Sequence, residues 1–280
     1  MEFGVEKGYI LTYDLGTGGL KSSLYNSNGE LVDVVFQKYP TYSPQVNWAE
    51  QDPESWWHSF CNSTKDILKK NKISPIQILV ISFSGQMMGC LPVNKTGEPL
   101  MNSIIWADRR SDTEAQLLKK EIKEYDFYKI TGNRIYPTYP ITKIMWVKKN
   151  HPEIYKETYK FLQAKDYIIY KLTDKFVTDY SDASGTALLD IQKKIWSAEI
   201  LEIARIDQGK LPEIHKSTEI IGKVRKEASI ESGLKTGTPI VLGGGDGPCA
   251  TLGAGVIQEG NAYVYLGTSC WVSSVRKDIL

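Results

Sequence analysis

Apolar and polar positions near the start of the chain alternate in short blocks. Apolar runs cover residues 9–13, 20–25 and 31–36, and they are separated by Leu15-Gly16-Thr17-Gly18-Gly19 and by Asn28-Gly29. Short apolar runs joined by glycine turns are typical of antiparallel strands. The pattern therefore predicts a three-stranded antiparallel meander.

A helix is predicted soon after the meander. Asp52-Pro53-Glu54 combines an N-cap residue, a proline suited to the first helical position and an acidic first turn. We expect this helix to run to about Lys70. An apolar strand over residues 76–83 should follow and lead into Ser84-Gly85-Gln86.

The rest of the chain alternates helices and strands. Mixed polar and aromatic segments over residues 111–211 predict mostly helices, and residues 239–242 form an apolar strand that ends in Gly243-Gly244-Gly245-Asp246. A helix over 247–256 and a closing hairpin are expected. A meander followed by alternating elements favours an α/β fold with a mixed sheet and flanking helices.

Composition narrows the class of protein. The 280 residues include 34 basic and 33 acidic side chains, for a net charge of +1, and 41% of the residues are hydrophobic. This balance is ordinary for a soluble globular protein and lacks the basic surface of a nucleic-acid binder or a polybasic membrane anchor. No leader-like or membrane-spanning run is seen, so a cytoplasmic location is expected.

Metal and disulfide frameworks are disfavoured by the spacing of their usual ligands. The four cysteines contain no C-x-x-C pair, and the three histidines lie far apart. A structural zinc site or a disulfide-stabilised fold is therefore not expected.

One segment near the end of the chain resembles a segment near its start. Residues 15–24 and 266–275 share Leu, Gly, Thr, Ser and Ser at matching places, and both are predicted as strand, Gly-Thr turn and strand. This similarity suggests a duplicated architecture. We expect residues 1–260 to form one domain, and 261–280 to begin a second domain that is mostly absent.

The first glycine turn is a candidate phosphate site. Gly16-Thr17-Gly18-Gly19 offers backbone N–H groups and a hydroxyl, as a polyphosphate requires, although the turn alone reads better as an ordinary hairpin. Asp14, at the end of the preceding strand, favours the phosphate site over the ordinary hairpin turn. A carboxylate there can hold Mg²⁺ through water.

Asp246 is a candidate catalytic residue. It follows three glycines at a predicted strand-to-helix junction, where capping of the helix is the simplest role. The glycines would also let other groups approach closely, and the helix dipole would keep the carboxylate ionised. Such a carboxylate could accept the proton of an attacking hydroxyl during phosphoryl transfer.

Two further loops offer groups suited to a sugar. Gln86, Met87 and Met88 follow one strand, and Trp106, Asp108 and Arg109 lie after the apolar Ile104-Ile105. Amide, carboxylate and guanidinium groups can bind vicinal hydroxyls, and an indole can cover the apolar face of a sugar. Taken singly, the methionines read as core residues, and Arg109 with Arg110 as a solvated pair.

Together these motifs resemble one known family. No G-x-S-x-G, H-E-x-x-H or complete G-x-G-x-x-G pattern is present, which disfavours hydrolase, zinc-protease and dinucleotide-binding functions. The chain is instead similar to FGGY-family carbohydrate kinases, and among them to xylulokinases. The resemblance covers essentially the whole chain through eight ordered motifs: Asp14-Leu15-Gly16-Thr17, Trp48-Ala49-Glu50-Gln51-Asp52-Pro53, Ser84-Gly85-Gln86-Met87, Ile105-Trp106-Ala107-Asp108-Arg109-Arg110, Lys165-Asp166-Tyr167, Ser181-Asp182-Ala183-Ser184-Gly185-Thr186, Gly243-Gly244-Gly245-Asp246 and Leu266-Gly267-Thr268-Ser269.

The resemblance implies a fold, cofactors and site roles. It implies an actin-like, ribonuclease-H-like fold of two domains, with sugar bound mainly by the first and ATP with Mg²⁺ in the cleft between them. Asp246 would be the catalytic base and Asp14 the carboxylate linked to magnesium. The phosphate-binding residues would be Gly16, Thr17, Gly18, Lys21, Gly267, Thr268 and Ser269, and the sugar-binding residues Gln86, Met87, Met88, Trp106, Asp108 and Arg109.

Two positions depart from the xylulokinase pattern. Xylulokinases resemble Ser-Gly-Gln-Met-His-Gly where this chain has Met88 in place of histidine, and Asp246-Gly247-Pro248-Cys249 replaces the more usual Asp-Asn-Ala-Ala. A thioether cannot donate the hydrogen bond that an imidazole can. The departure at Met88 leaves the identity of the sugar open.

The sequence therefore predicts an ATP-dependent kinase for a pentulose such as xylulose, or for a related sugar or polyol. A catalytically silent actin-like domain, serving as a sugar sensor or assembly module, is the alternative. Both share Asp14 and the phosphate turns, but only the enzyme requires Asp246 and a polar sugar loop. No nucleic-acid or membrane partner is expected, and a homodimer stays open.

Overall fold

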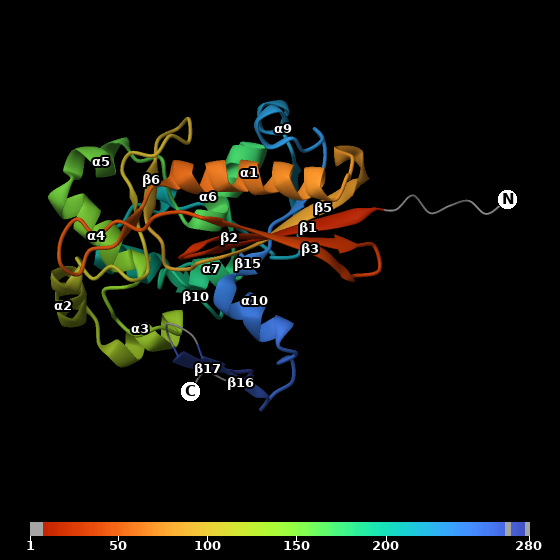
Figure 1. Ribbon diagram of the computed structural model, residues 1–280. Helices are drawn as coiled ribbons and strands as arrows, with labels where there is room; N and C mark the ends of the chain where they lie inside the picture. Colours follow the sequence, from red (N-terminus) through yellow and green to blue (C-terminus); the bar gives the residue numbers. More distant parts are fainter. Residues whose placement is uncertain (1–7, 267–269, 278–280) are drawn as a thin grey trace.

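The computed structural model describes residues 8–266 and 270–277 (Figure 1). The strands are β1 (Tyr9–Gly16), β2 (Gly19–Asn26), β3 (Leu31–Lys38), β4 (Glu50–Gln51), β5 (Ile78–Gly85), β6 (Leu91–Val93), β7 (Ser103–Ile104), β8 (Lys160–Leu162), β9 (Val177–Asp179), β10 (Leu189–Asp190), β11 (Ile195–Trp196), β12 (Glu213–His215), β13 (Ile220–Lys223), β14 (Pro239–Val241), β15 (Gly244–Gly245), β16 (Ala262–Leu266) and β17 (Cys270–Ser274). The helices are α1 (Pro53–Lys70), α2 (Asp112–Glu121), α3 (Glu124–Thr131), α4 (Pro140–Asn150), α5 (Pro152–Glu157), α6 (Ala164–Thr173), α7 (Tyr180–Ser184), α8 (Ala198–Ala204), α9 (Lys226–Ser232) and α10 (Asp246–Gly253), with 3-10 turns η1 (Pro75–Gln77) and η2 (Gln208–Lys210).

The main sheet is mixed, as predicted. Its strand order is β13-β14-β5-β1-β2-β3, with β15 also paired to β5. The predicted meander is confirmed, because β1, β2 and β3 pair antiparallel in sequence order. Strands β1, β14 and β15 all run parallel to β5. The expected strand over 76–83 begins later, at Ile78, because Pro75 opens a 3-10 turn.

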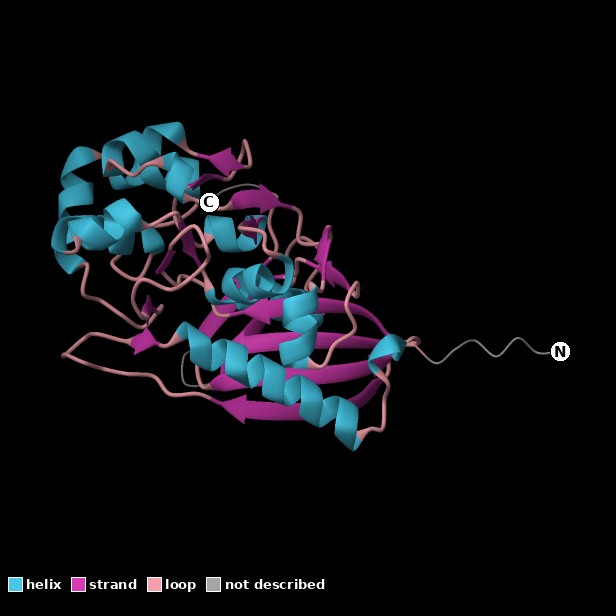
Figure 2. Cartoon of the chain, turned by 90° about the horizontal axis from the view of Figure 1, so that it is seen from above, coloured by secondary structure: helices cyan, strands magenta, loops and turns pink. Residues whose placement is uncertain are grey.

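Helix α1 covers one face of this sheet, and Figure 2 shows it lying across the strands. It begins as predicted: the Asp52 side chain accepts a hydrogen bond from the Glu54 N–H, and Pro53 occupies the first turn. Its buried polar groups are paired with the sheet, through Tyr13 to Thr64 and Ser22 to Ser63, each at 2.7 Å. These pairs avoid the cost of burying unbonded hydroxyls.

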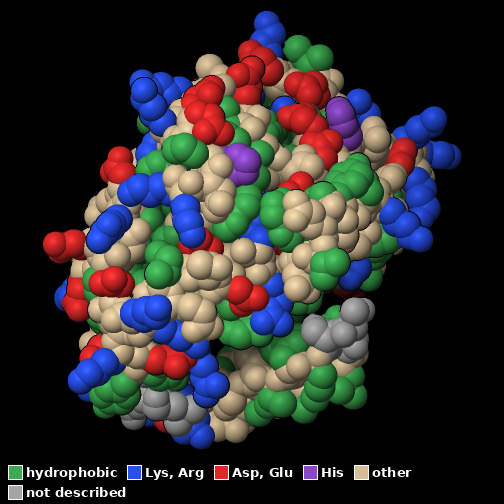
Figure 3. All heavy atoms as spheres, turned by 90° about the vertical axis from the view of Figure 1, so that its left-hand side faces the viewer, with side chains coloured by type: hydrophobic (Ala, Val, Ile, Leu, Met, Phe, Trp, Pro, Cys, Tyr) green, Lys and Arg blue, Asp and Glu red, His purple; other side chains and the backbone are tan. Residues whose placement is uncertain are grey.

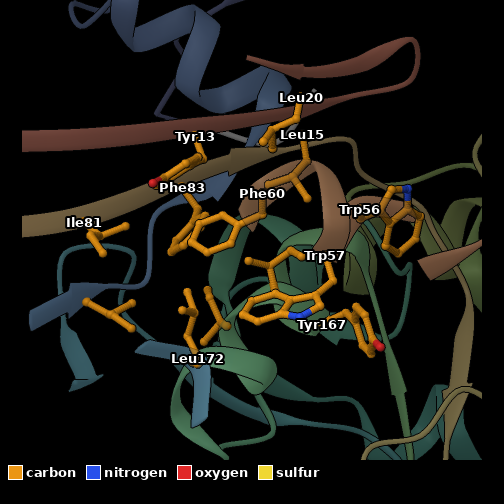
Figure 4. Close-up of a cluster of buried hydrophobic side chains, with 14 of the residues drawn as sticks. Tyr13, Leu15, Leu20, Trp56, Trp57, Phe60, Ile81, Phe83, Tyr167 and Leu172 are labelled. Atoms are coloured by element: carbon orange, nitrogen blue, oxygen red, sulfur yellow. The ribbon is translucent and has the colours of Figure 1, made fainter. Parts of the chain in front are cut away.

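Aromatic side chains fill the layer between α1 and the sheet (Figure 4). Tyr13, Phe60 and Phe83 lie against one another, with ring centroids 4.5 to 6.2 Å apart. Trp57 stacks on Phe60 at 5.3 Å. Burial of such large apolar surfaces is the main force that holds α1 to the sheet.

A second hydrophobic core lies within the helices beyond the sheet. It includes Leu118 of α2, Phe127 of α3, Val147 of α4 and Ile200 of α8, all fully buried. Figures 1 and 2 show these helices grouped to one side of the sheet. The predicted helical region over 111–211 is therefore confirmed, with short strand pairs between the helices. The predicted closing hairpin is also present, as β16 and β17.

Acidic and basic side chains are intermingled on the face drawn in Figure 3, in keeping with the near-neutral net charge. Among the residues that the structure describes, no helix combines the length and the apolar character needed to cross a membrane.

Candidate active site

Three parallel strands end together and set the position of the candidate site. Ser84 of β5 lies opposite Asp14 of β1 on one side and Gly244 of β15 on the other. The segments that follow these strands therefore leave the sheet at one edge. This edge is where open α/β sheets commonly bind ligands. It brings together the Gly16-Thr17-Gly18 turn, the loop that starts at Gln86, and Asp246.

Asp246 is the first residue of α10. The sequence prediction that it is the N-cap is wrong by one position, because Gly245 has the extended backbone of the cap residue. The Asp246 Oδ1 instead accepts a hydrogen bond from the Gly247 N–H at 2.8 Å. Asp246 is thus not the N-cap residue, although one of its carboxylate oxygens bonds an N–H of the first helical turn.

The environment of Asp246 raises its pKa. Desolvation of the carboxyl group by nearby protein atoms is the main cause. The hydrogen bond from Gly247 opposes it and the negative charge of Asp14 adds to it, and together they raise the pKa to about 6. A carboxyl group with such a pKa is mostly ionised at neutral pH, yet it takes up a proton more readily than an ordinary aspartate. These are the properties of a general base.

The glycines before Asp246 are required by close contacts. Gly243 has φ +73°, and a Cβ there would lie 1.9 Å from the Phe83 carbonyl oxygen. A Cβ on Gly245 would lie 2.5 Å from the sulfur of Met87. The glycines therefore let this segment pack directly against β5 and Met87, so Met87 lies beside the residue that precedes Asp246.

The Gly16-Thr17-Gly18 turn is held by side chains on its carbonyl and hydroxyl groups. The Tyr39 hydroxyl donates to the Gly16 carbonyl. Gln51 Nε2 donates to the Thr17 carbonyl at 2.7 Å, and Trp106 Nε1 donates to the Thr17 hydroxyl at 2.8 Å. Space around Gly18 is open, since a Cβ there would meet no atom within 4 Å. Packing within the described fold does not explain the glycine at 18.

Asp14 and Lys21 face each other across the β1–β2 hairpin. They are partners in the strand register, and Lys21 Nζ lies 3.9 Å from Asp14 Oδ2. Both side chains are about half exposed, at 43% for Asp14 and 55% for Lys21. The other predicted phosphate-binding residues, Gly267, Thr268 and Ser269, lie outside the described residues.

The residues present fit a hydrated magnesium ion. Asp14 offers carboxylate oxygens, and its side chain is open to solvent. Its negative charge also contributes to the raised pKa of Asp246. Mg²⁺ prefers oxygen ligands, keeps several waters and is commonly bound through one or two carboxylates.

Gln86 connects the loop that it begins to the Gly16-Thr17-Gly18 turn. It is buried, and its Nε2 donates to Gln51 Oε1 at 2.7 Å, while Gln51 in turn donates to the Thr17 carbonyl. Gln86 Oε1 is buried without a hydrogen-bond donor among the described residues. The structure thus gives Gln51, which the sequence placed only in a family motif, a bridging contact between the loop and the turn.

The loop after Ile105 is arranged differently from the sequence expectation. Asp108 is fully buried, and its oxygens accept hydrogen bonds from the Ala49 N–H at 2.6 Å and from the Arg110 guanidinium. In this structure Asp108 is therefore not open to a sugar. It holds Arg110, which was expected to be solvated but has a side chain only 1% exposed.

Arg110 and Arg109 have opposite surroundings. The Arg110 guanidinium lies 3.7 Å from the ring centroid of Trp48 and also binds Glu50 at 2.8 Å. Arg109 is the solvated member, 3.6 Å from Asp112, with 47% of its side chain exposed. Arg109 and the half-exposed Trp106 are thus the members of this loop that a ligand can reach.

Lys143 of α4 is a feature that sequence reasoning missed. Its fully buried amine donates to the backbone carbonyls of Met88 and Ile105, each at 2.7 Å. Met88 has a left-handed backbone with φ +63°, which is unusual for a methionine. Lys143 therefore ties the two predicted sugar loops together. A lysine within the apolar Ile141–Val147 stretch is the signal that could have indicated it.

Comparison with known proteins places these features in a family. Residues 9–253 match the model of the FGGY family of carbohydrate kinases, N-terminal domain. A xylulose kinase of Staphylococcus xylosus is 33% identical over 93% of this chain and 54% of its own length. A gluconokinase of Bacillus subtilis (strain 168) is 34% identical over 93% of this chain and 50% of its own length.

Solved structures agree with this placement. A ligand-bound xylulose kinase from Lactobacillus acidophilus has a TM-score of 0.89 and 32% identity, covering 95% of this chain and 54% of that one. Plasmodium falciparum glycerol kinase with ADP also has a TM-score of 0.89, at 25% identity, covering 95% and 54%. The fold is thus the expected actin-like, ribonuclease-H-like α/β architecture. The chain spans about half the length of the curated relatives it matches. It belongs to the FGGY family of carbohydrate kinases and matches that family's N-terminal domain.

Proposed function

We propose that the protein to which this chain belongs transfers the γ-phosphoryl group of ATP to a hydroxyl of a sugar or polyol. The observation that carries the proposal is the position of Asp246, whose pKa is about 6, at the edge shared with the Gly16-Thr17-Gly18 turn and the Gln86 loop. Residues 1–260 would bind the sugar, and residues 261–280 would begin the nucleotide-binding second domain.

Each group has a defined part in this reaction. The ionised Asp246 carboxylate takes the proton of the attacking hydroxyl as its oxygen bonds to the γ-phosphorus. The bond from that phosphorus to the bridging oxygen breaks, and ADP leaves. Magnesium, held through water by Asp14, would neutralise charge on the phosphates. The turn at 16–18 and Lys21 would bind the phosphates, together with Gly267, Thr268 and Ser269.

The sugar would lie over the loops tied together by Lys143. Trp106 and Arg109 are exposed there, Met87 lies beside Gly245, and Gln86 offers an acceptor without a donor. The relatives include both a xylulose kinase and a gluconokinase. A pentulose and a sugar acid are therefore the first substrates to compare.

The test is Asp246→Asn in the full-length protein, assayed by ADP release with xylulose and with gluconate. We expect sugar binding and melting temperature to stay close to wild type, because the side chain keeps its shape and does not cap α10. We expect kcat to fall by roughly a hundredfold to ten-thousandfold, the range for a positioned acid or base. Retention of more than about a tenth of the wild-type kcat would rule out the base role.

A silent sensor or assembly domain would give a different result. Such a protein would release no ADP in a sugar-dependent manner, with or without Asp246. The same assay therefore separates the two functions.

A further inference from the structure

A buried cluster of charged side chains lies behind the candidate active site. Lys165 Nζ is 3.0 Å from Asp166 Oδ1, 3.2 Å from Asp179 Oδ1 and 3.2 Å from Asp182 Oδ2. All four side chains are at most 1% exposed. They come from two sequence motifs, and from Asp179 between them, to which the proposed reaction assigns no role.

Burying one ammonium group with three carboxyl groups costs free energy unless the charged groups are paired and hydrogen-bonded. The protonation state of each carboxyl group therefore matters. Burial raises the pKa of Asp166 and, more strongly, that of Asp182, so these groups retain protons more readily. Asp179 differs: burial acts to raise its pKa, but Lys165 and the hydrogen bonds from Ser181 and Ser217 outweigh it, and the pKa is lowered. Asp179 is therefore the partner that stays ionised beside Lys165.

The second carboxylate oxygen of Asp179 begins a series of hydrogen bonds that leads toward Asp246. Asp179 Oδ2 accepts from the Ser181 hydroxyl at 2.6 Å and from the Ser181 N–H at 2.8 Å. Because its proton is committed to Asp179, the Ser181 oxygen is free to accept, and it does so from the Gly245 N–H at 2.9 Å. The path thus ends on the amide of Gly245, the residue before Asp246.

This path reaches a segment that has no side chains of its own, although Met87 packs against Gly245. Gly243, Gly244 and Gly245 contribute no side-chain contacts of their own, and β15 is only two residues long. A glycine-rich segment is conformationally permissive. The Ser181 hydroxyl, itself bonded to the ionised Asp179, accepts a hydrogen bond from the Gly245 N–H and so limits the backbone motion of this segment.

We infer that Lys165, Asp179 and Ser181 are positioning residues that fix the direction of the Asp246 carboxylate through the Gly245 N–H. The inference rests on the proposed function in one respect, that Asp246 is the base. Ammonium, carboxylate, hydroxyl and amide form one continuous path from the core to the reacting group. Misplacement of a catalytic group by about 1 Å can cost up to a hundredfold in rate.

The main variant is Ser181→Ala, with Ser217→Ala as its matched control. The Ser217 hydroxyl also donates to Asp179 Oδ2, at 2.8 Å, but it has no hydrogen bond to Gly245. In the full-length protein we expect Ser181→Ala to lower kcat roughly tenfold with sugar KM changed less than about twofold. Ser217→Ala should change kcat less than about twofold. Asp179→Asn, which keeps the shape but loses the charge, should act in the same direction as Ser181→Ala.

Two further measurements separate this inference from the base assignment. Amide hydrogen exchange at Gly245, followed by NMR, should accelerate in Ser181→Ala and not in Ser217→Ala, whatever Asp246 does in catalysis. In the Asp246→Asn background, Ser181→Ala should cause no further loss of kcat beyond about twofold, because its effect acts through Asp246.

The outcomes distinguish the two ideas. If Asp246→Asn abolishes turnover but Ser181→Ala leaves kcat and Gly245 exchange unchanged, the positioning role is wrong and the base role stands. Equal losses from Ser181→Ala in both backgrounds would also overturn it, since Ser181 would then act independently of Asp246. Near-normal turnover in Asp246→Asn would instead remove the proposed base, whatever exchange at Gly245 shows. If Ser181→Ala does not fold, Asp179→Asn carries the same test.

Discussion

At the scale of single residues, the pKa of Asp246 makes the proposed chemistry testable by pH. The base must be ionised to accept a proton, and its raised pKa is about 6. We therefore expect kcat/KM to rise about tenfold per pH unit below 6 and to level off above 7, because this ratio reports the free enzyme. Steady-state assays from pH 5 to 8 would measure it. A flat profile over that range would contradict the assignment.

Lys143 provides a second residue-scale prediction, on stability. Burial, with a smaller contribution from the charge of Arg110, lowers its pKa to about 7 despite the opposing effects of Cys90 and Asp108. The unfolded chain, with an ordinary lysine pKa, then holds more protons than the folded chain above pH 7. The free energy of unfolding should therefore rise with pH between about 7 and 10.5, by up to about 1.4 kcal/mol per pH unit.

The comparison with Lys143→Met isolates this effect. The methionine removes the titrating group and keeps most of the side-chain volume. The free energy of unfolding of the wild type should therefore rise relative to that of the variant as pH increases. Urea unfolding of both proteins at pH 7, 8 and 9 would measure the difference. A difference in unfolding free energy that is independent of pH would show that Lys143 is not desolvated as described.

At the scale of elements, the junction of β14, β15 and α10 depends on one glycine. Gly243 needs both a positive φ of +73° and the absence of a Cβ, which would lie 1.9 Å from the Phe83 carbonyl oxygen. Gly237 is the matched control, since it has φ +90° but nothing within 4 Å of its Cβ position. The pair separates backbone strain from steric conflict.

We expect Gly237→Ala to cost about 1–2 kcal/mol of unfolding free energy, from the left-handed backbone alone. Gly243→Ala should cost distinctly more, because β14 must also move away from β5. Urea unfolding would give both values. Similar costs for the two variants would mean that the junction can move without loss, and that its geometry does not hold Asp246 in place.

At the scale of the whole molecule, the site lies where the sheet half and the helical half of the chain meet. Gln86 follows the central strand β5, whereas Lys143 reaches the same loops from helix α4. The loops at the site are therefore contacted from both hydrophobic cores. The relatives are about twice as long as this chain.

We accordingly expect the 280-residue chain to bind its sugar substrate by itself but to show little phosphoryl transfer. Calorimetry would measure sugar binding, and ADP release would measure turnover against the full-length protein. Turnover within tenfold of the full-length protein would show that this chain alone holds everything that catalysis needs.

Several features followed from the sequence alone because their causes are local. The meander follows from glycine turns between apolar runs, and the start of α1 from Asp52-Pro53-Glu54. The strand that leads to Asp246 follows from an apolar run that ends in glycines. Each depends on backbone preferences and side chains only a few residues apart. The ordered motifs then indicated the family, which the comparison confirmed.

Other features were decided only by tertiary structure, because burial is set by elements far apart in the chain. Asp108 was predicted to bind a sugar and Arg110 to be solvated, but the Ala49 N–H binds Asp108, and Trp48 and Glu50 cover Arg110. Lys143 was not singled out in the sequence, and its burial comes from two distant loops whose carbonyls it binds. A one-residue shift likewise freed Asp246 from the cap position. Desolvation and pairing depend on packing across the whole fold, and no local pattern in the sequence specifies them.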